Sequence, residues 1–276
     1  MSEVLSLREV QECSLEILKK IDAICREQGL TYYIFYGSLI GAIRHKGFIP
    51  WDDDLDIAMP RDDYEKLLVY FDENKEALLP LKLFDWKRVK DYPYDLARIS
   101  DTSYRMIPEN EKECGMGTFI DIYVIDGMGN DYKAAVKNKR MTARLSSLGF
   151  LATRKRYARD NTKSTLKMII KVPAFIGAKI IGKRWIFSKI DSLSDIYPFE
   201  SSKYVANTAW STGVEVSIFK KEWFDHTIDV PFEDAVFKAP SGYDELLRQL
   251  YGDYMQLPPE EDRTQQHFYS IVKREN

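Results

Sequence analysis

The fold of this chain is most constrained by a short segment in which acidic and apolar residues alternate. Residues 54–59 read DLDIAM, and Pro60 follows them. Alternation with a period of two is typical of a β-strand with one buried face, and proline rarely continues a strand. Asp54 and Asp56 are therefore expected on one face of a half-buried strand, where an unpaired carboxylate is costly without a cation.

A second segment has the character of a central strand. Residues 118–125 read TFIDIYVI, in which Asp121 is the only charged residue among strong β-formers. Further strands are predicted at 31–36, 81–86 and 93–99, where apolar and aromatic residues cluster. The first part of the chain thus supplies several strands and three acids that those strands can position.

Helices are predicted around these strands. Ser6 and Glu9 have the spacing of a capping box, and apolar residues then recur at helical spacing until Gly29. A short helix is expected at 39–44. Two further helices are expected, one capped by Asp62 or Asp63 and one running from a Ser241 cap to Gly252.

Charge is distributed unevenly along the 276 residues. The formal net charge is −3, yet residues 133–189 carry sixteen Lys or Arg and one acid, Asp160, whereas the remainder carries 24 basic and 42 acidic residues. With 45% hydrophobic and 30% charged residues, the chain can bury a full core, which excludes the disordered and fibrous classes. The basic middle segment is therefore expected to meet something anionic.

The basic segment also has a helical pattern. Lysines recur at multiples of four from Lys163 to Lys183, beside a wide apolar face. From Lys163 to Arg184, with a kink at Pro173, this is typical of a helix in the surface of an anionic bilayer. The alternative is a helical subdomain that packs on the sheet with its lysines in water. Nucleic acid is not expected as a partner, because the densest basic part has few interleaved aromatics.

Signals for a cellular compartment are few. Cys13, Cys25 and Cys114 form neither an even framework nor a CxxC pair, which favours a reduced compartment. The N-terminal residues are charged where a signal peptide is apolar, and no run reaches the ~18 apolar residues of a spanning helix. We expect a cytoplasmic protein with peripheral contact at the inner face of the membrane.

Five residues form a candidate site for phosphate and metal. Gly37 and Ser38 lie between a predicted strand and a helix, and such a turn offers N–H groups and a hydroxyl to a phosphate. Asp54, Asp56 and Asp121 supply the oxygen ligands that Mg²⁺ or Mn²⁺ takes when it also binds substrate phosphates. Together they predict phosphoryl or nucleotidyl transfer. The alternatives are an ordinary turn and a solvated acidic loop.

A group of cations next to an aromatic residue is a second candidate site. Arg44, His45 and Lys46 lie shortly before Trp51 in the sequence. They could bind donor phosphates beside an aromatic face. The alternative is that they complement the C-terminal end of a helix.

Three more polar residues are candidates for substrate binding. Arg98 could neutralise charge on the transferred group, and its alternative role is a surface ion pair. Arg263 and His267 follow a Pro-Pro turn. Quaternary ammonium groups bind over ring faces, and the candidate rings are those of Trp51, Tyr33, Tyr36 and Tyr94.

Three stretches of the sequence resemble the LicD family. Residues 36–59, YGSLIGAIRHKGFIPWDDDLDIAM, closely resemble its signature. Residues 119–127, FIDIYVIDG, are similar to its third-carboxylate strand, and residues 251–263, YGDYMQLPPEEDR, to its C-terminal block. LicD proteins are phosphotransferases of the nucleotidyltransferase fold, related in pattern to fukutin-type proteins. Residues 131–204 carry no recognised motif.

The resemblance implies transfer of phosphocholine from CDP-choline to a hydroxyl of a cell-surface glycan, of the teichoic acid or lipopolysaccharide type and linked to lipid. It makes Asp54 and Asp56 the paired metal ligands, with Asp52 and Asp53 in second rank, and Asp121 the third carboxylate and candidate base. It makes Gly37-Ser38 the phosphate-holding turn. The alternatives are another CDP-linked phospho-alcohol, such as ribitol or glycerol phosphate, and a non-catalytic binding module.

These patterns together predict an α+β enzyme. We expect a nucleotidyltransferase-like core with a mixed sheet and flanking helices, plus a basic, mainly helical insertion. The expected segments are a catalytic core at 1–130, the insertion at 131–203, and a C-terminal part at 204–276 that completes the catalytic domain.

Overall fold

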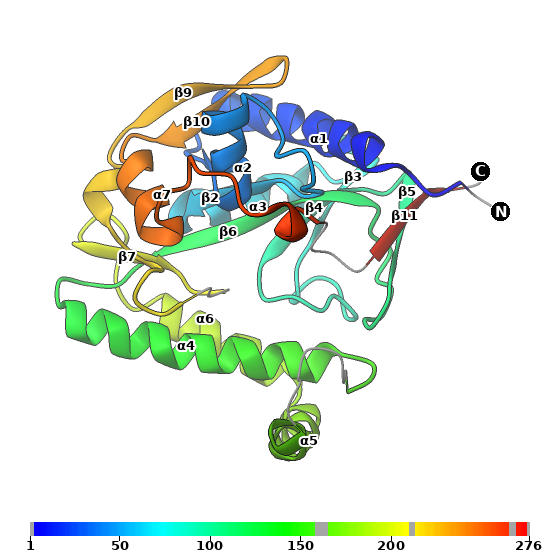
Figure 1. Ribbon diagram of the computed structural model, residues 1–276, viewed down its shortest axis with the longest axis vertical. Coiled ribbons are helices and arrows are strands. Elements are labelled where there is room, and N and C mark those ends of the chain that lie inside the picture. The colour runs from blue at the N-terminus through cyan, green and yellow to red at the C-terminus, as the bar shows by residue number, and fades with distance from the viewer. Residues whose placement is uncertain (1–2, 158–164, 210–212, 265–268, 275–276) are drawn as a thin grey trace.

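The computed structural model describes residues 3–157, 165–209, 213–264 and 269–274 (Figure 1). It has a mixed α+β architecture, in which helices flank a twisted, mostly antiparallel sheet. The predicted α+β class, mixed sheet and flanking helices are therefore confirmed.

The central sheet is built around β6 (Thr118–Gly127), which is buried along its whole length. Its neighbours are β2 (Asp56–Pro60), parallel to it, and β4 (Ala97–Asp101), antiparallel to it. The sheet order is β1-β2-β6-β4-β3, with β1 at Tyr33–Ile34 and β3 at Leu81–Phe84. β7 (Tyr204–Asn207) pairs with the last residues of β6, and β8 (Ile218–Lys220) pairs with β7.

Helix α1 (Leu7–Gln28) lies on one face of the sheet, and both of its ends agree with the sequence. Ser6 and Glu9 form a capping box, and Gly29 ends the helix in the left-handed conformation at φ 64°. Residues such as Leu18 and Ile21 are fully buried in the main core. The core thus fixes α1 against the sheet strands.

Several predicted element bounds are wrong. The strand expected at 31–36 is only β1, because Tyr36 already begins α2 (Tyr36–Ile40), which continues as a π-helix at Gly41–His45. Pro60 is the last residue of β2 and occupies the N-cap of α3 (Arg61–Glu73), so neither Asp62 nor Asp63 caps that helix. The Asp63 carboxylate instead accepts a hydrogen bond from the N–H of Thr31 at 2.9 Å.

The C-terminal elements return to the core. A hairpin of β9 (Thr227–Phe232) and β10 (Ala235–Pro240) precedes α7 (Tyr243–Tyr251), and β11 (Tyr269–Lys273) pairs with β5 (Tyr104–Pro108). Short 3₁₀ turns lie at Lys221–Phe224 and Glu260–Asp262. Gly252 ends α7 as predicted, but its N-cap is Gly242, so the Ser241 cap is wrong.

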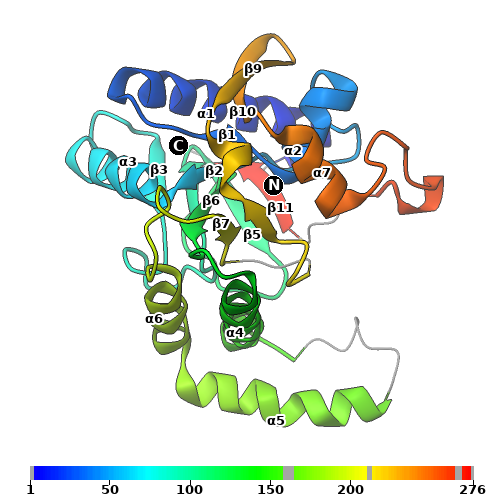
Figure 2. The ribbon, with the colours of Figure 1, turned by 90° about the vertical axis from the view of Figure 1, so that its left-hand side faces the viewer.

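Three helices form the segment between β6 and β7, namely α4 (Tyr132–Thr153), α5 (Thr165–Ile181) and α6 (Lys183–Ser194). Figure 2 shows α5 running across beneath α4 and α6 as the outermost layer. Gly182, at φ 83°, separates α5 from α6, so the single helix expected up to Arg184 is wrong. Lys163 lies outside the described residues. Among those that are described, no helix is long and apolar enough to cross a bilayer.

Candidate active site

A row of charged side chains crosses three neighbouring strands. Asp121 of β6 is in register with Asp56 of β2 on one side and with Arg98 of β4 on the other. Residues in register on adjacent strands point to the same face of a sheet, so the three side chains lie side by side. Asp54, just before β2, joins them: single oxygens of Asp54, Asp56 and Asp121 all lie within 4.8 Å of one another. The structure thus brings together the three acids singled out in the sequence.

Asp56 is the poorly compensated acid of this row. Asp56 and Asp121 are only 6% and 4% exposed. Burial, followed by the negative charges of Asp54 and Asp121, raises the pKa of Asp56 well above its usual value. The Oδ1 atom of Asp56 has no hydrogen-bond partner within the described part of the chain. Crowded, buried carboxylates with an unfilled acceptor favour a bound cation, and an all-oxygen set suits Mg²⁺ or Mn²⁺.

Arg98 holds Asp121 from the other side. Its Nε lies 2.5 Å from Asp121 Oδ1 and its Nη2 3.3 Å from Oδ2. Its Cζ lies 3.9 Å from the ring centroid of Tyr94 and 4.0 Å from that of Phe119. Arg98 is 6% exposed, so its ion pair is not the surface pair considered as its alternative role. The Nη1 atom has no partner among the residues described, which leaves one donor beside the acids for a ligand.

The Gly37-Ser38 turn lies against the same acids. Both residues belong to the first turn of α2. Ser38 Oγ accepts the N–H of Asp56 at 2.8 Å, which ties the start of α2 to the start of β2. A Cβ added at Gly37 would lie 2.7 Å from Oδ2 of Asp52, so the backbone approaches that carboxylate more closely than another residue allows. Asp52 and the buried Asp53 flank the site but do not belong to the group of three.

The second predicted group forms a basic corner with the C-terminal block. Arg44 Nη1 donates to the carbonyls of Tyr254 and Gln256 at 2.6 and 3.2 Å, and Arg44 Nε donates to His45 Nε2 at 2.9 Å. The Cζ atom of Arg263 lies 5.7 Å from the ring centroid of Trp51. Burial, and secondarily the charge of Arg263, lowers the pKa of Arg44. Neither arginine forms an ion pair with a carboxylate within the described ranges, so both keep charge for an anionic ligand.

The remaining predicted residues are placed less favourably for a ligand. Lys46 is exposed at the end of the π-helix with φ 61°. The rings of Tyr33 and Tyr36 are buried in the main core, so a quaternary ammonium cannot reach them, and Arg98 already occupies one face of the half-buried Tyr94 ring. Trp51 is half-buried, so part of this residue stays accessible. His267 lies outside the described residues.

A second buried ion pair was not anticipated. Asp126 pairs with Arg61 and accepts a hydrogen bond from the Thr208 hydroxyl at 2.9 Å. Asp126 follows Asp121 by five residues, an odd number, so the period-two rule already placed it on the opposite face of β6. The signal was present in the sequence, but its partner arginine was not identifiable.

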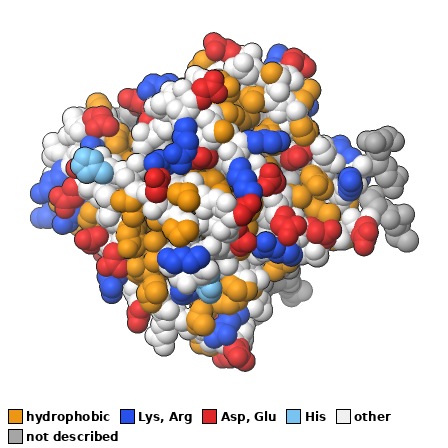
Figure 3. All heavy atoms as spheres, turned by 90° about the horizontal axis from the view of Figure 1, so that it is seen from above, with side chains coloured by type: hydrophobic (Ala, Val, Ile, Leu, Met, Phe, Trp, Pro, Cys, Tyr) orange, Lys and Arg blue, Asp and Glu red, His pale blue; other side chains and the backbone are white. Residues whose placement is uncertain are grey.

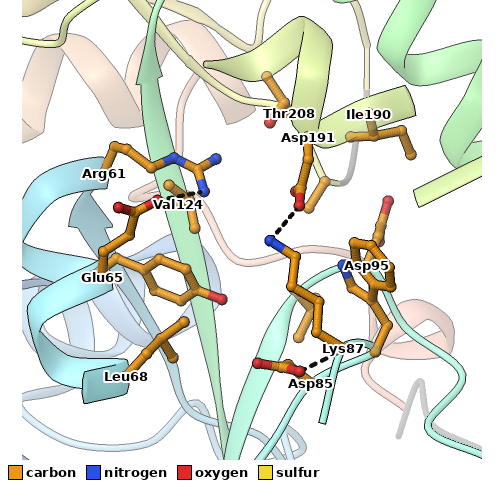
Figure 4. Close-up of a pocket in the computed structure, with 14 residues that line it drawn as sticks. Arg61, Glu65, Leu68, Asp85, Lys87, Asp95, Val124, Ile190, Asp191 and Thr208 are labelled. Carbon is orange, nitrogen blue, oxygen red and sulfur yellow. Dashed lines mark hydrogen bonds and ion pairs between the residues drawn. The ribbon is translucent and has the colours of Figure 1, made fainter. Parts of the chain in front are cut away.

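A cavity of about 50 Å³ lies near this second pair, between α3 and α6 (Figure 4). Arg61, Asp95 and Thr208 line it, and an ion pair of 2.6 Å joins Lys87 Nζ to Asp191 across it. None of the three clustered acids lines this cavity. The acid row and the cavity are therefore separate features of the molecule.

Comparison with known proteins agrees with this geometry. The family model described as LicD/FKTN/FKRP, nucleotidyltransferase domain, matches residues 29–142, which contain all three clustered acids. The lipopolysaccharide cholinephosphotransferase LicD of Haemophilus influenzae is 34% identical over 274 residues, covering 95% of this chain and 96% of that protein. Shorter similarities link the chain to uncharacterized proteins of Rickettsia typhi, 36% identical over 59 residues, and Rickettsia prowazekii, 40% identical over 48 residues. These cover 20% and 17% of this chain, and 19% and 18% of those proteins. Similarity along nearly the full length of both chains shows that this chain belongs to the LicD family and is an enzyme of the LicD type.

Proposed function

We propose that this enzyme transfers phosphocholine from CDP-choline to a hydroxyl of a lipid-linked cell-surface glycan, on a nucleotidyltransferase-like core. The observation that carries the proposal is the row of Asp56, Asp121 and Arg98, in which Asp56 Oδ1 and Arg98 Nη1 have no partner among the described residues. Support comes from the Haemophilus relative, whose name describes phosphocholine transfer to lipopolysaccharide. A transferred phosphoryl group needs both cationic and metal-binding partners, and this row offers both.

The donor atoms fit a divalent metal. Asp54, Asp56 and Asp121 would hold it, because their oxygens converge and Asp56 Oδ1 lacks a protein partner among the described residues. When bound, Mg²⁺ or Mn²⁺ supplies charge neutralisation at the phosphate oxygens.

The protein residues would bind and orient the two substrates. The N–H groups of the Gly37-Ser38 turn and Arg98 Nη1 face the phosphates, while Arg44 and Arg263 hold the nucleotide side of the donor. The acceptor hydroxyl oxygen attacks the choline-side phosphorus, the bond to the CMP oxygen breaks, and CMP leaves. Asp121 is our candidate for the group that takes the hydroxyl proton, and Arg98 fixes its orientation.

The test is a CMP-release assay on the full chain with a crude glycan acceptor. The donors are CDP-choline, CDP-ribitol and CDP-glycerol, each with MgCl₂ or with EDTA. Asp56→Asn is the site variant, and Asp62→Asn, an exposed acid in the first turn of α3, is its matched control. We expect release from CDP-choline that needs metal, is lost in Asp56→Asn and is unchanged in Asp62→Asn.

The other outcomes separate the alternatives. Release only from CDP-ribitol or CDP-glycerol would overturn the choline assignment and keep the acid site. Release that persists in EDTA would overturn the metal. Absence of release from every donor, with a folded protein, would favour the non-catalytic binding module.

A further inference from the structure

One exposed side of α4 carries a stripe of positive charge. Its members are three or four residues apart, so they share one side of the helix. The opposite side of α4 carries buried residues such as Ala135, which packs in a small cluster with β7 and β8. None of the stripe residues forms an ion pair with a described residue. They are Lys133, Lys137, Arg140 and Arg144, all exposed.

The outermost helix, α5, adds an apolar surface. Ala178 is buried, and Lys179 Nζ donates to the carbonyls of Ala152 and Arg154, so this side of α5 is attached to the end of α4. The other side is uncovered: Ile180 is 81% exposed, and Trp185, just past the Gly182 break, is 54% exposed. Val172, Ile176 and Ile181 are exposed as well.

The surface of the insertion, with its basic stripe and exposed apolar residues, differs from the molecular face over α1 and the β9–β10 hairpin. Figure 3 shows acidic and basic side chains interspersed on that face. On the insertion, residues 133–189 contain a single acid, Asp160. A strongly one-signed charge beside large exposed apolar residues matches the surface of an anionic bilayer, where apolar side chains enter the boundary and cations meet lipid phosphates.

We propose that the insertion docks on an anionic lipid bilayer through the α4 stripe and the exposed apolar residues of α5 and α6. A second copy of the chain fits less well, because two such basic faces would repel each other. The proposal does not rest on the transferase chemistry, so its failure would leave the proposed function standing.

The test is flotation of the full chain with vesicles of phosphatidylglycerol and phosphatidylcholine, compared with vesicles of phosphatidylcholine alone. Two double variants probe the two components, Lys137→Glu with Arg140→Glu, and Ile180→Ser with Trp185→Ser. Their matched controls use exposed residues on other elements. These are Lys20→Glu with Lys82→Glu, and Val69→Ser with Val236→Ser.

We expect the parent to bind the anionic vesicles, and 0.5 M NaCl to weaken this binding. Each insertion variant should lower the partitioning onto these vesicles about tenfold or more, and its control should lower it little. Equal binding to both vesicle types, or equal loss in controls and variants, would overturn the proposal. The same samples without lipid are examined by sedimentation velocity. A dimer that the Ile180→Ser, Trp185→Ser variant loses, with no vesicle binding by the parent, would make the face a contact between copies instead.

Discussion

Strand β6 carries two buried aspartates, each paired with an arginine, and their surroundings differ. Asp126 binds Arg61 through two contacts of 2.8 and 3.0 Å, and Thr208, which accepts from Ser194, donates to it as well. Asp121 binds Arg98, but the pair leaves Arg98 Nη1 without a partner among the described residues.

The residues next to the two ion pairs differ as well. Asp121 lies beside Asp56, another buried acid, whose Oδ1 accepts no hydrogen bond from the described residues, whereas Asp126 accepts one from the Thr208 hydroxyl. Burial and ion pairing alone therefore do not identify a functional acid. Our proposal for the acid row rests instead on its unsatisfied donor and acceptor atoms, since most buried polar atoms have a hydrogen-bond partner.

The largest effect is expected from Asp56→Asn. We expect CMP release to fall about a thousandfold, since several kcal/mol of lost transition-state stabilisation corresponds to that factor. The folded protein without metal should become more stable, because a crowded buried charge is removed. Activity assays and urea titrations measure both. A loss of stability with unchanged activity would contradict this prediction and would mean that Asp56, like Asp126, has a structural role.

Asp126→Asn should give the reverse pattern. Removing the charge leaves Arg61 without its buried partner, so the free energy of unfolding should fall by about 3 kcal/mol. CMP release per folded molecule should change little, because Asp126 lies on the opposite face of β6 from the acid row. Urea titration, with exposed Asp62→Asn as the control, measures the loss. A large drop in turnover without a stability loss would contradict the structural role.

Divalent metal should distinguish the two pairs directly. A ligand at a hundred times its Kd stabilises the folded state by about 2.7 kcal/mol, which in a chain of this size raises Tm by roughly 5 °C. Mg²⁺ or Mn²⁺ added to protein prepared in EDTA should produce this rise in the parent and in Asp126→Asn. The rise should be absent in Asp56→Asn. An equal rise in all three proteins would place the metal elsewhere.

The sequence predicted the acids but not the row that they form. Alternation of acidic and apolar residues was enough to assign Asp56 to a strand, and a run of β-formers was enough for Asp121. Capping residues were enough to place α1. The alignment with Arg98 depends on the pairing of β2, β6 and β4, whose partners are distant in sequence and have no local signal.

Errors in the prediction arose where tertiary contacts override a local pattern. The lysine spacing continued smoothly across Gly182, where the chain turns between two helices. Tyr33 and Tyr36 were candidate cation-binding rings, but packing against the core buries both. Aromatic composition cannot tell a core ring from a ligand-binding ring, because burial is decided by the whole fold.

The smallest effect is expected at Asp95, a third acid, whose carboxylate accepts from the Ser146 hydroxyl at 2.7 Å. Burial raises the pKa of Asp95 to about 7, against an unfolded value near 3.8. Between about pH 4 and pH 7 the folded state keeps a proton that the unfolded state has lost, so this group makes stability fall as pH rises. The substitution Asp95→Asn should remove this loss of stability with rising pH.

The free energies of unfolding of Asp95→Asn and the parent should therefore converge near pH 4, with the variant more stable at pH 7. The full shift corresponds to about 4 kcal/mol, and solvent screening of the half-buried Asp95 lowers the expected difference to about 1 kcal/mol. Urea titrations at both pH values measure this, with Asp62→Asn as the control. A variant that is less stable at pH 7 would mean that the Ser146 hydrogen bond outweighs the burial of charge, as we expect the Arg61 ion pair to do in the Asp126→Asn test. The outcome thus decides which of the two pairs on β6 Asp95 resembles.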